Sequence, residues 1–387
     1  MRLRLLTVWL LLLVDFCFLG LSLWYLFARK NFLASIGLFL ASCVVLFAIK
    51  RLLRWLTKLQ ISAKAFKKGN FREAENQLLE AAELAKKFKP TDPRLGMLWN
   101  ELGVLYLADA EYPDAGRYLR QALTLREQLF GPDHVMVAES LLNLGTWHLG
   151  MARIVEAESL YLRSQQVFNR CLKPGHVYIA LVLSNLACLR FEQGKFAQAE
   201  QLGLQARAML AACRHRQKDR VLAHVLNNLG ETYLKLGKRA QAEALFSQSR
   251  EDWEKSLSPE HPFVARPLSN LAECRMQRQE YGEARRLLKR ARSLLEKALR
   301  PDHPLMAVTL SKMAAIYEAE GNFAKAESLH RSALKMRESV LGPEHPDVVE
   351  TLEDLADLCR KTGREPEASL LTARARAIPV WSVAPDE

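Results

Sequence analysis

Histidine is the side chain whose recurrence here most directly suggests chemistry, because imidazole binds metals and transfers protons near neutral pH. Five histidines recur at steps of 42 or 85 residues: His134, His176, His261, His303 and His345. A metal ion needs its ligands around one point, and residues that lie at least one repeat apart cannot gather there. We therefore interpret these histidines as caps at helix junctions and predict no metal site.

No catalytic motif accompanies the histidines. The sequence lacks a Gly-x-x-x-x-Gly-Lys phosphate loop, a His-Glu-x-x-His zinc motif and a Gly-x-Ser-x-Gly nucleophile motif. Its seven cysteines form no Cys-x-x-Cys pair, and we interpret them as reduced apolar residues. They are Cys17, Cys43, Cys171, Cys188, Cys213, Cys274 and Cys359. The sequence predicts a protein that is not an enzyme and has no cofactor.

The net charge of +12 is concentrated near the N-terminus. Residues 1–70 contain eleven basic side chains and one acid, Asp15, which gives +10 and leaves +2 for the rest of the chain. A nucleic-acid-binding protein usually carries its basic residues on the folded surface that contacts phosphates. We therefore predict no nucleic-acid partner, and interpret these charges as flanking a membrane segment.

Two apolar runs lie among these basic residues, at residues 5–28 and 32–49. A helix of about 20 apolar residues can cross a bilayer, so we expect a transmembrane helical hairpin within a membrane anchor of residues 1–58. The positive-inside rule places both ends of the hairpin, and the residues that follow, in the cytoplasm. This predicts a multi-pass protein of a bacterial inner membrane.

Three alternatives to the hairpin remain open. The Arg-rich start could belong to a cleaved signal peptide, and Leu40-Ala41-Ser42-Cys43 resembles a lipoprotein cleavage box. The second run could instead lie in the membrane interface beside a single span. Asp15 would either face a partner helix or be tolerated in a long apolar segment.

The rest of the chain is repetitive. A Leu or Met followed by a small residue recurs at steps of 42 or 43 residues: Leu102-Gly103, Leu144-Gly145, Leu186-Ala187, Leu229-Gly230, Leu271-Ala272, Met313-Ala314 and Leu355-Ala356. Each copy is followed at a nearly constant distance by an alanine: Ala115, Ala157, Ala199, Ala242, Ala284, Ala326 and Ala368. Small residues allow two helix backbones to approach closely. With a degenerate copy near residues 69–74, the pattern predicts eight helix pairs in residues 59–376.

The junctions between pairs have a consistent chemistry, such as Gly342-Pro343-Glu344-His345-Pro346. Glycine ends one helix, and proline is tolerated at the start of the next because its missing N–H would be unpaired there. One pair cannot bury its apolar face alone, so the array must fold by stacking. The junction at residues 213–220 departs from this pattern and is either a surface loop or a basic contact site.

This pattern resembles the tetratricopeptide repeat. The 42-residue period and the Leu-Gly-Pro-Glu-His-Pro junction are similar to the kinesin-light-chain subgroup, over about residues 60–376, although no heptad segment resembles that of kinesin light chains. The resemblance implies an all-α, right-handed superhelical solenoid. It also implies that the first helix of each pair lines a concave groove that holds a protein or peptide partner.

One series of polar residues falls immediately before the repeat leucine: Asn143, Asn185, Asn228 and Asn270. By resemblance, these amides would bind the backbone of an extended peptide along the groove. Arg266, on the same helix face as Asn270, and Lys312, one repeat later, would bind an acidic group of that partner. The alternative, compatible with binding, is that the asparagines bond a neighbouring helix and stabilise stacking.

Two functional hypotheses follow. The first is a membrane-tethered scaffold or adaptor that binds a peptide or protein in its groove. The second is an assembly subunit of a membrane complex that acts through its transmembrane hairpin. The C-terminal tail, residues 377–387, either is loose or docks on the last repeat through Trp381.

Overall fold

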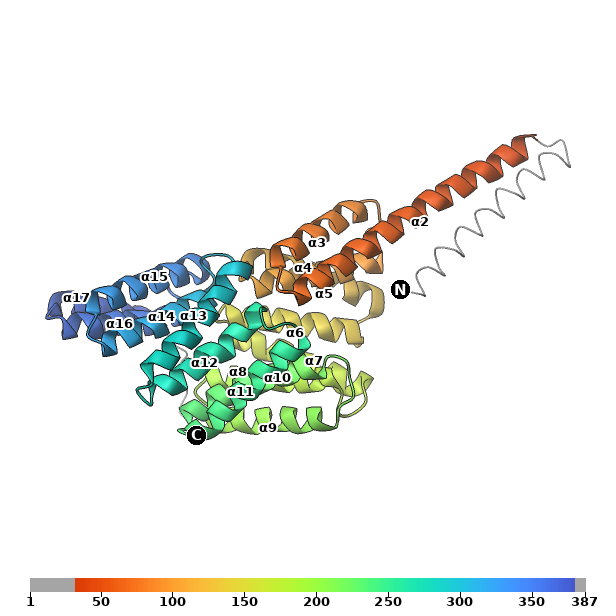
Figure 1. Cartoon of the computed structure of the whole chain (residues 1–387). Coiled ribbons are helices and arrows are strands. Elements are labelled where there is room, and N and C mark those ends of the chain that lie inside the picture. Colours follow the sequence, from red (N-terminus) through yellow and green to blue (C-terminus); the bar gives the residue numbers. More distant parts are fainter. Residues whose placement is uncertain (1–31, 380–387) are drawn as a thin grey trace. The chain divides into compact units, whose positions relative to one another are not determined.

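In the computed structural model, which describes residues 32–379, the chain consists of helices joined by short turns (Figure 1). Sixteen α-helices and one 3-10 helix follow one another in this range. They are α2 (Phe32–Lys67), α3 (Phe71–Ala85), α4 (Pro93–Ala108), α5 (Tyr112–Phe130), α6 (Val135–Gly150), α7 (Ile154–Cys171), α8 (Val177–Glu192), α9 (Phe196–Ala212), α10 (Lys218–Lys235), α11 (Arg239–Ser256), η1 (Pro262–Val264), α12 (Ala265–Met276), α13 (Tyr281–Ala298), α14 (Pro304–Ala319), α15 (Phe323–Leu341), α16 (Pro346–Lys361) and α17 (Glu365–Ala377). The predicted all-α solenoid is confirmed.

The chain divides into two compact units. Within the described residues, one unit contains residues 32–62 and 77–87, and the other contains residues 63–76 and 88–379. The larger unit contains the seven helix pairs from α4–α5 to α16–α17, in which each even-numbered helix is the first of its pair.

Small residues set the distance between the helices of a pair, as the repeat pattern predicted. The seven repeat alanines, from Ala115 to Ala368, are all buried. A Cβ added at Gly230 would lie 2.5 Å from the ring of Phe246, which is closer than van der Waals contact allows. Only glycine therefore fits at this crossing, and the large ring on the partner helix fills the space that the glycine leaves.

Each of the five predicted junction histidines caps the start of a first helix, or of η1 in front of α12, which confirms the predicted capping role. In each case the ring Nδ1 accepts a hydrogen bond from the backbone N–H two residues later, at 3.1–3.3 Å. This bond satisfies one of the N–H groups that have no partner inside the helix. At the junction of residues 213–220, His215 Nδ1 accepts from the backbone N–H of Gln217 at 3.1 Å, but Gln217 precedes α10, which begins without a side-chain cap.

Two of these histidines also close the superhelix. His261 Nε2 lies 3.0 Å from the carbonyl oxygen of Phe66, and His303 Nε2 lies 3.3 Å from that of Ala108. Both pairs are 195 residues apart. Because Nδ1 accepts a hydrogen bond, a neutral ring carries its proton on Nε2 and donates it to the carbonyl. Each carbonyl lies in the last turn of a first helix, where it has no partner within the helix.

Further contacts support this closure. The Arg300 backbone N–H donates to Asp109 Oδ1 at 3.2 Å, and the Arg300 guanidinium pairs with Glu111 in the turn between α4 and α5. The ring of Phe263 lies 6.1 Å from the ring centroid of Phe66, in an edge-to-face arrangement. Repeats that are far apart in sequence therefore pack against each other, with the start of α14 against the end of α4 (Figure 1).

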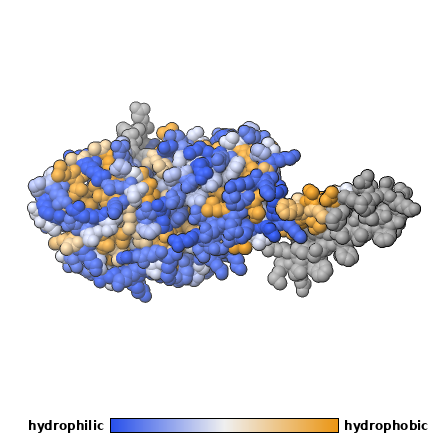
Figure 2. Space-filling view, turned by 90° about the horizontal axis from the view of Figure 1, so that it is seen from above, coloured by the Kyte–Doolittle hydropathy of each residue, from blue (hydrophilic) through white to orange (hydrophobic). Residues whose placement is uncertain are grey.

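The predicted transmembrane hairpin is not supported. The second predicted span, residues 32–49, is the first half of α2, which continues without a break through residues 50–67 and carries six basic side chains there. Within residues 32–379, no helix is long and apolar enough to cross a membrane. Four apolar side chains of α2, Leu40, Val44, Val45 and Phe47, are exposed, and this stretch is orange in Figure 2.

The predictions that depended on the hairpin are therefore wrong as well. These are the membrane anchor, the multi-pass inner-membrane location and the assembly subunit that acts through its spans. The first predicted span, residues 5–28, and Asp15 lie outside the described residues, as does Trp381. In the described part of the C-terminal segment, Ile378 is buried against Val348 and Leu352 of α16.

His303→Asn should destabilise the protein by about 1–3 kcal/mol, because asparagine can still cap α14 but cannot reach the Ala108 carbonyl, which is left buried without a donor. His134→Asn is the matched control, since within the described residues the His134 ring caps α6 but makes no closure bond. Urea unfolding of the two variants measures the difference. Equal stability losses would contradict the closure.

Stability should also fall as the pH drops from about 7 to about 4. Burial lowers the pKa of His261 and of His303 from 6.5 to about 4, so in this window the unfolded chain binds protons that the folded chain does not. The stabilising contribution is therefore complete above pH 7 and is lost as the pH falls. Unfolding curves at pH 7, 5.5 and 4 should show a smaller loss in His303→Asn than in the unmodified chain.

Candidate binding channel

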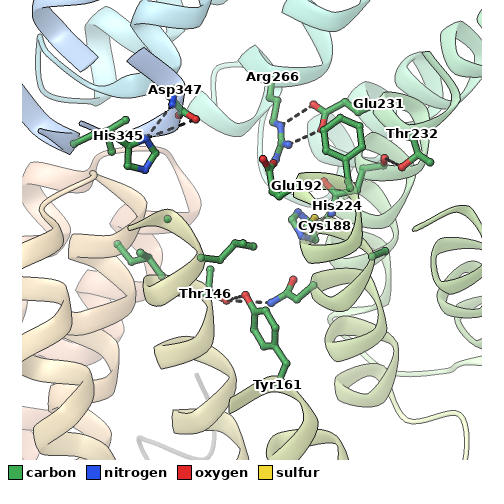
Figure 3. A pocket seen from close by; sticks show the side chains of 18 of the residues that line it. Thr146, Tyr161, Cys188, Glu192, His224, Glu231, Thr232, Arg266, His345 and Asp347 are labelled. Carbon is green, nitrogen blue, oxygen red and sulfur yellow. Dashed lines mark hydrogen bonds and ion pairs between the residues drawn. The ribbon is translucent and has the colours of Figure 1, made fainter. Parts of the chain in front are cut away.

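The inner side of the superhelix contains two partly open cavities of about 380 and 560 Å³ in the larger unit, which share part of their lining, and Figure 3 shows the first of them. Most of their lining comes from the even-numbered helices α6, α8, α10, α12 and α14, together with the first turn of α16. The first helices thus line the concave side, as the resemblance implied. Five residues line both cavities: Phe191, Glu192, Glu231, Arg266 and Asp347. We refer to the two cavities together as the channel.

The channel contains three of the four predicted asparagines. Asn185 and Asn228 line the first cavity and Asn270 lines the second, and all three are largely buried. Asn143 lines neither cavity, and its Nδ2 donates to Asn100 Oδ1 of α4 at 3.1 Å.

The amide groups of the channel asparagines bond the preceding first helix. Asn185 Nδ2 donates to Thr146 Oγ1 at 3.0 Å, and Asn228 Nδ2 donates to Ser184 Oγ at 3.1 Å. Asn228 Nδ2 also lies 3.1 Å from His224 Nε2. The stacking role that the sequence left open is therefore present, and it fixes the orientation of each amide.

The two predicted cations, Arg266 and Lys312, already have acidic partners. Arg266 makes a bidentate pair with Glu231, with Nε at 3.0 Å and Nη2 at 2.6 Å from its oxygens, and Lys312 Nζ lies 2.7 Å from Glu273 Oε2. Burial alone would raise the pKa of Glu231, but the charge of Arg266 and its hydrogen bonds outweigh this and lower it. An acidic partner would have to displace these internal carboxylates.

Asn270 joins these two pairs into one network. Its Nδ2 donates to Glu231 Oε1 at 2.8 Å and to Asn227 Oδ1 at 3.2 Å, while its Oδ1 accepts from Lys312 Nζ at 3.0 Å. The network connects α10, α12 and α14 across three repeats, and its polar groups satisfy one another.

A thiol and an imidazole beside the network have pKa values far from neutral pH. Burial raises the pKa of the Cys188 thiol to about 12, and burial with the nearby charge of Arg266 lowers the pKa of His224 to about 4. A thiol with a raised pKa is a poor nucleophile. Burial also raises the pKa of Tyr161, whose hydroxyl bonds Thr146 at 3.2 Å (Figure 3). The described residues contain no group of three or more His, Cys, Asp or Glu side chains placed to hold a metal.

Two acids that the sequence did not suggest as binding residues lie at the centre of the channel. Glu192, the last residue of α8, lies seven positions after Asn185 and so shares its helix face, which is the signal that could have found it. Asp347 follows the last junction directly and lies in the first turn of α16. No pattern along the sequence shows that the superhelix brings Asp347 to Glu192.

The tetratricopeptide repeat family matches the chain at residues 93–164, 151–212, 221–297, 263–339 and 305–379. These segments cover well over half of the chain, so the chain belongs to the tetratricopeptide repeat family. None of the curated protein sequences compared with the chain matches it.

Two solved structures of low sequence identity share the fold. The apo quorum sensor NprR from B. thuringiensis aligns with a TM-score of 0.57 and 15% identity, covering 93% of this chain and 97% of NprR. A Rap protein complexed with competence and sporulation factor aligns with a TM-score of 0.56 and 13% identity, covering 84% and 97%. A putative kinesin light chain from Podosopora anserina aligns with a TM-score of 0.39 and 25% identity, covering 52% and 96%.

Asn270→Ala should lower the free energy of unfolding by about 1–3 kcal/mol, because it leaves buried groups of Asn227, Glu231 and Lys312 without this partner. Asn143→Ala, which removes one bond from a half-buried side chain, should cost about 1 kcal/mol or less. Chemical unfolding of both variants measures the costs. An equal or smaller cost for Asn270→Ala would mean that the network does not stabilise the stacking.

Proposed function

We propose that this protein is a non-catalytic scaffold that holds an extended peptide segment of a partner in its channel. The observation that carries the proposal is the contiguous channel along successive first helices, with Asn185, Asn228 and Asn270 placed along it. A peptide in the channel needs partners for its backbone N–H and C=O groups, and amide side chains supply both kinds.

One acceptor beside the channel has no hydrogen-bond donor. Asn228 lines the first cavity and is 6% exposed, and its buried Oδ1 accepts no hydrogen bond within the described part of the chain. Its Nδ2 donates to Ser184 Oγ and lies 3.1 Å from His224 Nε2. A buried acceptor without a donor costs free energy, and a small rotation of the amide that let a ligand N–H reach this oxygen would recover that cost.

Two solved structures with a similar fold support this proposal. The solved Rap structure with a similar fold contains competence and sporulation factor, and NprR is described as a quorum sensor. Both cover most of this chain, although their low sequence identity transfers no individual contact. We propose that the same architecture serves ligand binding in this protein.

The test is to select binders for the full-length protein from a library of random ten-residue peptides with acetylated and amidated ends. Glu192→Trp should reduce the affinity of the selected peptides more than tenfold, because the indole would fill the region where the two cavities meet. Glu156→Trp is the matched control, since Glu156 is exposed on α7, the second helix of its pair.

Additional variants test the predicted polar residues. Asn185→Ala, Asn228→Ala and Lys312→Glu should weaken the same peptides while the helical circular dichroism signal is retained. If the peptides bind all three folded variants and Glu192→Trp as well as they bind the unmodified protein, the channel is not the binding site.

A further inference from the structure

Within the described residues, most cations of the channel have ion-pair partners, whereas two of its carboxylates do not. Three cations have a carboxylate partner within 4 Å: Arg266 with Glu231, Lys312 with Glu273, and Arg337 with Glu350. The Glu192 carboxylate makes no ion pair within the described residues. The Asp347 side chain is 52% exposed, and the ring of His345, at 3.7 Å, is the basic group within 4 Å of its carboxylate among the described residues.

The contact between Asp347 and His345 is not an ion pair. His345 Nδ1 accepts a hydrogen bond from the Asp347 backbone N–H at 3.2 Å, so this nitrogen carries no proton that could pair with the carboxylate. Burial further lowers the pKa of His345, which keeps the ring neutral. The nearby Arg337 donates to the backbone oxygen of Asp347 and pairs with Glu350. The Asp347 carboxylate therefore has no cationic partner.

Glu192 and Asp347 belong to opposite ends of the array but to the same binding space. Glu192 ends α8, Asp347 lies in the first turn of α16, and both line both cavities. Figure 3 shows Glu192 on the side of the pocket where Arg266 and Glu231 lie, and Asp347 with His345 on another side. The two acids line the same cavities because the superhelix closes, so the central region has two unpaired acids from separate repeats.

The neighbouring polar atoms are also acceptors. Asn228 Oδ1 is without a donor, and Thr232 spends its hydroxyl proton on the Asn228 backbone carbonyl at 3.0 Å. Lys235 is a cation without an ion pair within the described residues, but it lines only the second cavity. The unpaired groups that the first cavity presents to a ligand are thus the exposed carboxylates of Glu192 and Asp347, which can accept from several ligand N–H groups.

We propose that this region binds a cationic group of the peptide, either a Lys or Arg side chain or the N-terminal ammonium. This inference rests on the proposed function and adds the chemical class of the ligand to it. An ammonium or guanidinium group has several N–H donors and a positive charge, whereas an acidic group would face Glu192 and Asp347 without a free cation in the first cavity.

The protonation of Glu192 is consistent with an unfilled cation site. Burial raises the pKa of Glu192 to about 7, and the negative charges of Asp347 and Glu231 act in the same direction. Arg266 and Lys235 act in the opposite direction but do not restore the ordinary value. A bound cation beside Glu192 would stabilise its carboxylate, which links ligand binding to loss of this proton.

The test uses the full-length protein and four labelled pools of random ten-residue peptides, measured by fluorescence anisotropy. Three pools have an acetylated N-terminus and a fixed central Lys, Glu or Gln, and the fourth has a free N-terminus and a central Gln. The Lys pool should bind at least about tenfold more tightly than the acetylated Gln pool, and the Glu pool more weakly than both. Preference for the fourth pool over the Lys pool would assign the cation to the peptide N-terminus.

Charge variants test the two acids directly. Glu192→Gln and Asp347→Asn should each remove most of the preference for the cationic pool, and Glu192→Lys should reverse it in favour of the Glu pool. Glu156→Lys changes the same charge on the outer helix α7 and should leave the preference unchanged.

Two results would overturn the inference in distinguishable ways. If Glu192→Trp abolishes binding but the acetylated Lys, Glu and Gln pools and the free-terminus pool bind the unmodified protein equally, the channel binds peptides without a cation site. If Glu192→Trp leaves binding intact, or if no pool binds, the proposed function fails and the cation site fails with it.

Discussion

The hydrogen bond from a junction histidine to a carbonyl 195 residues earlier is the interaction on which the rest of the structure depends. One imidazole does two things, since Nδ1 caps the helix that begins at the junction and Nε2 donates to the end of a helix in an earlier repeat. Both partners are groups that a helix end leaves unpaired. The superhelix is therefore closed by the same polar groups that would otherwise need water.

Closure of the superhelix determines whether the first helices line an open groove or a channel. An open solenoid would present a groove to solvent, whereas here the start of α16 completes a channel that begins at α6. Arg266, Glu231, Asn270 and Lys312 satisfy one another across three repeats. Glu192 and Asp347 are exposed and are not part of that network. We propose that this difference marks the region where a ligand binds.

The sequence was most informative where the physics is local and periodic. The small residue at Gly230 and the cap at His303 could be predicted because helix crossing and helix initiation depend on neighbours within one repeat. The closure could not, because it results from small rotations that accumulate over more than four repeats. Glu192 and Asp347 line the same cavities only because of that closure, so neither was a candidate. The membrane prediction failed because apolar residues 32–49 belong to one long helix with a basic second half.

The most direct measurement of the central claim, a closed channel that holds a peptide, is photo-crosslinking from inside and outside the channel. A photoreactive phenylalanine analogue would replace Phe191, which lines both cavities, or Val155, which is 78% exposed on α7. With an acetylated, lysine-containing peptide selected for binding, mass spectrometry should find the peptide attached at position 191 and not at position 155. Attachment at position 155 only, or equally at both positions, would contradict the account.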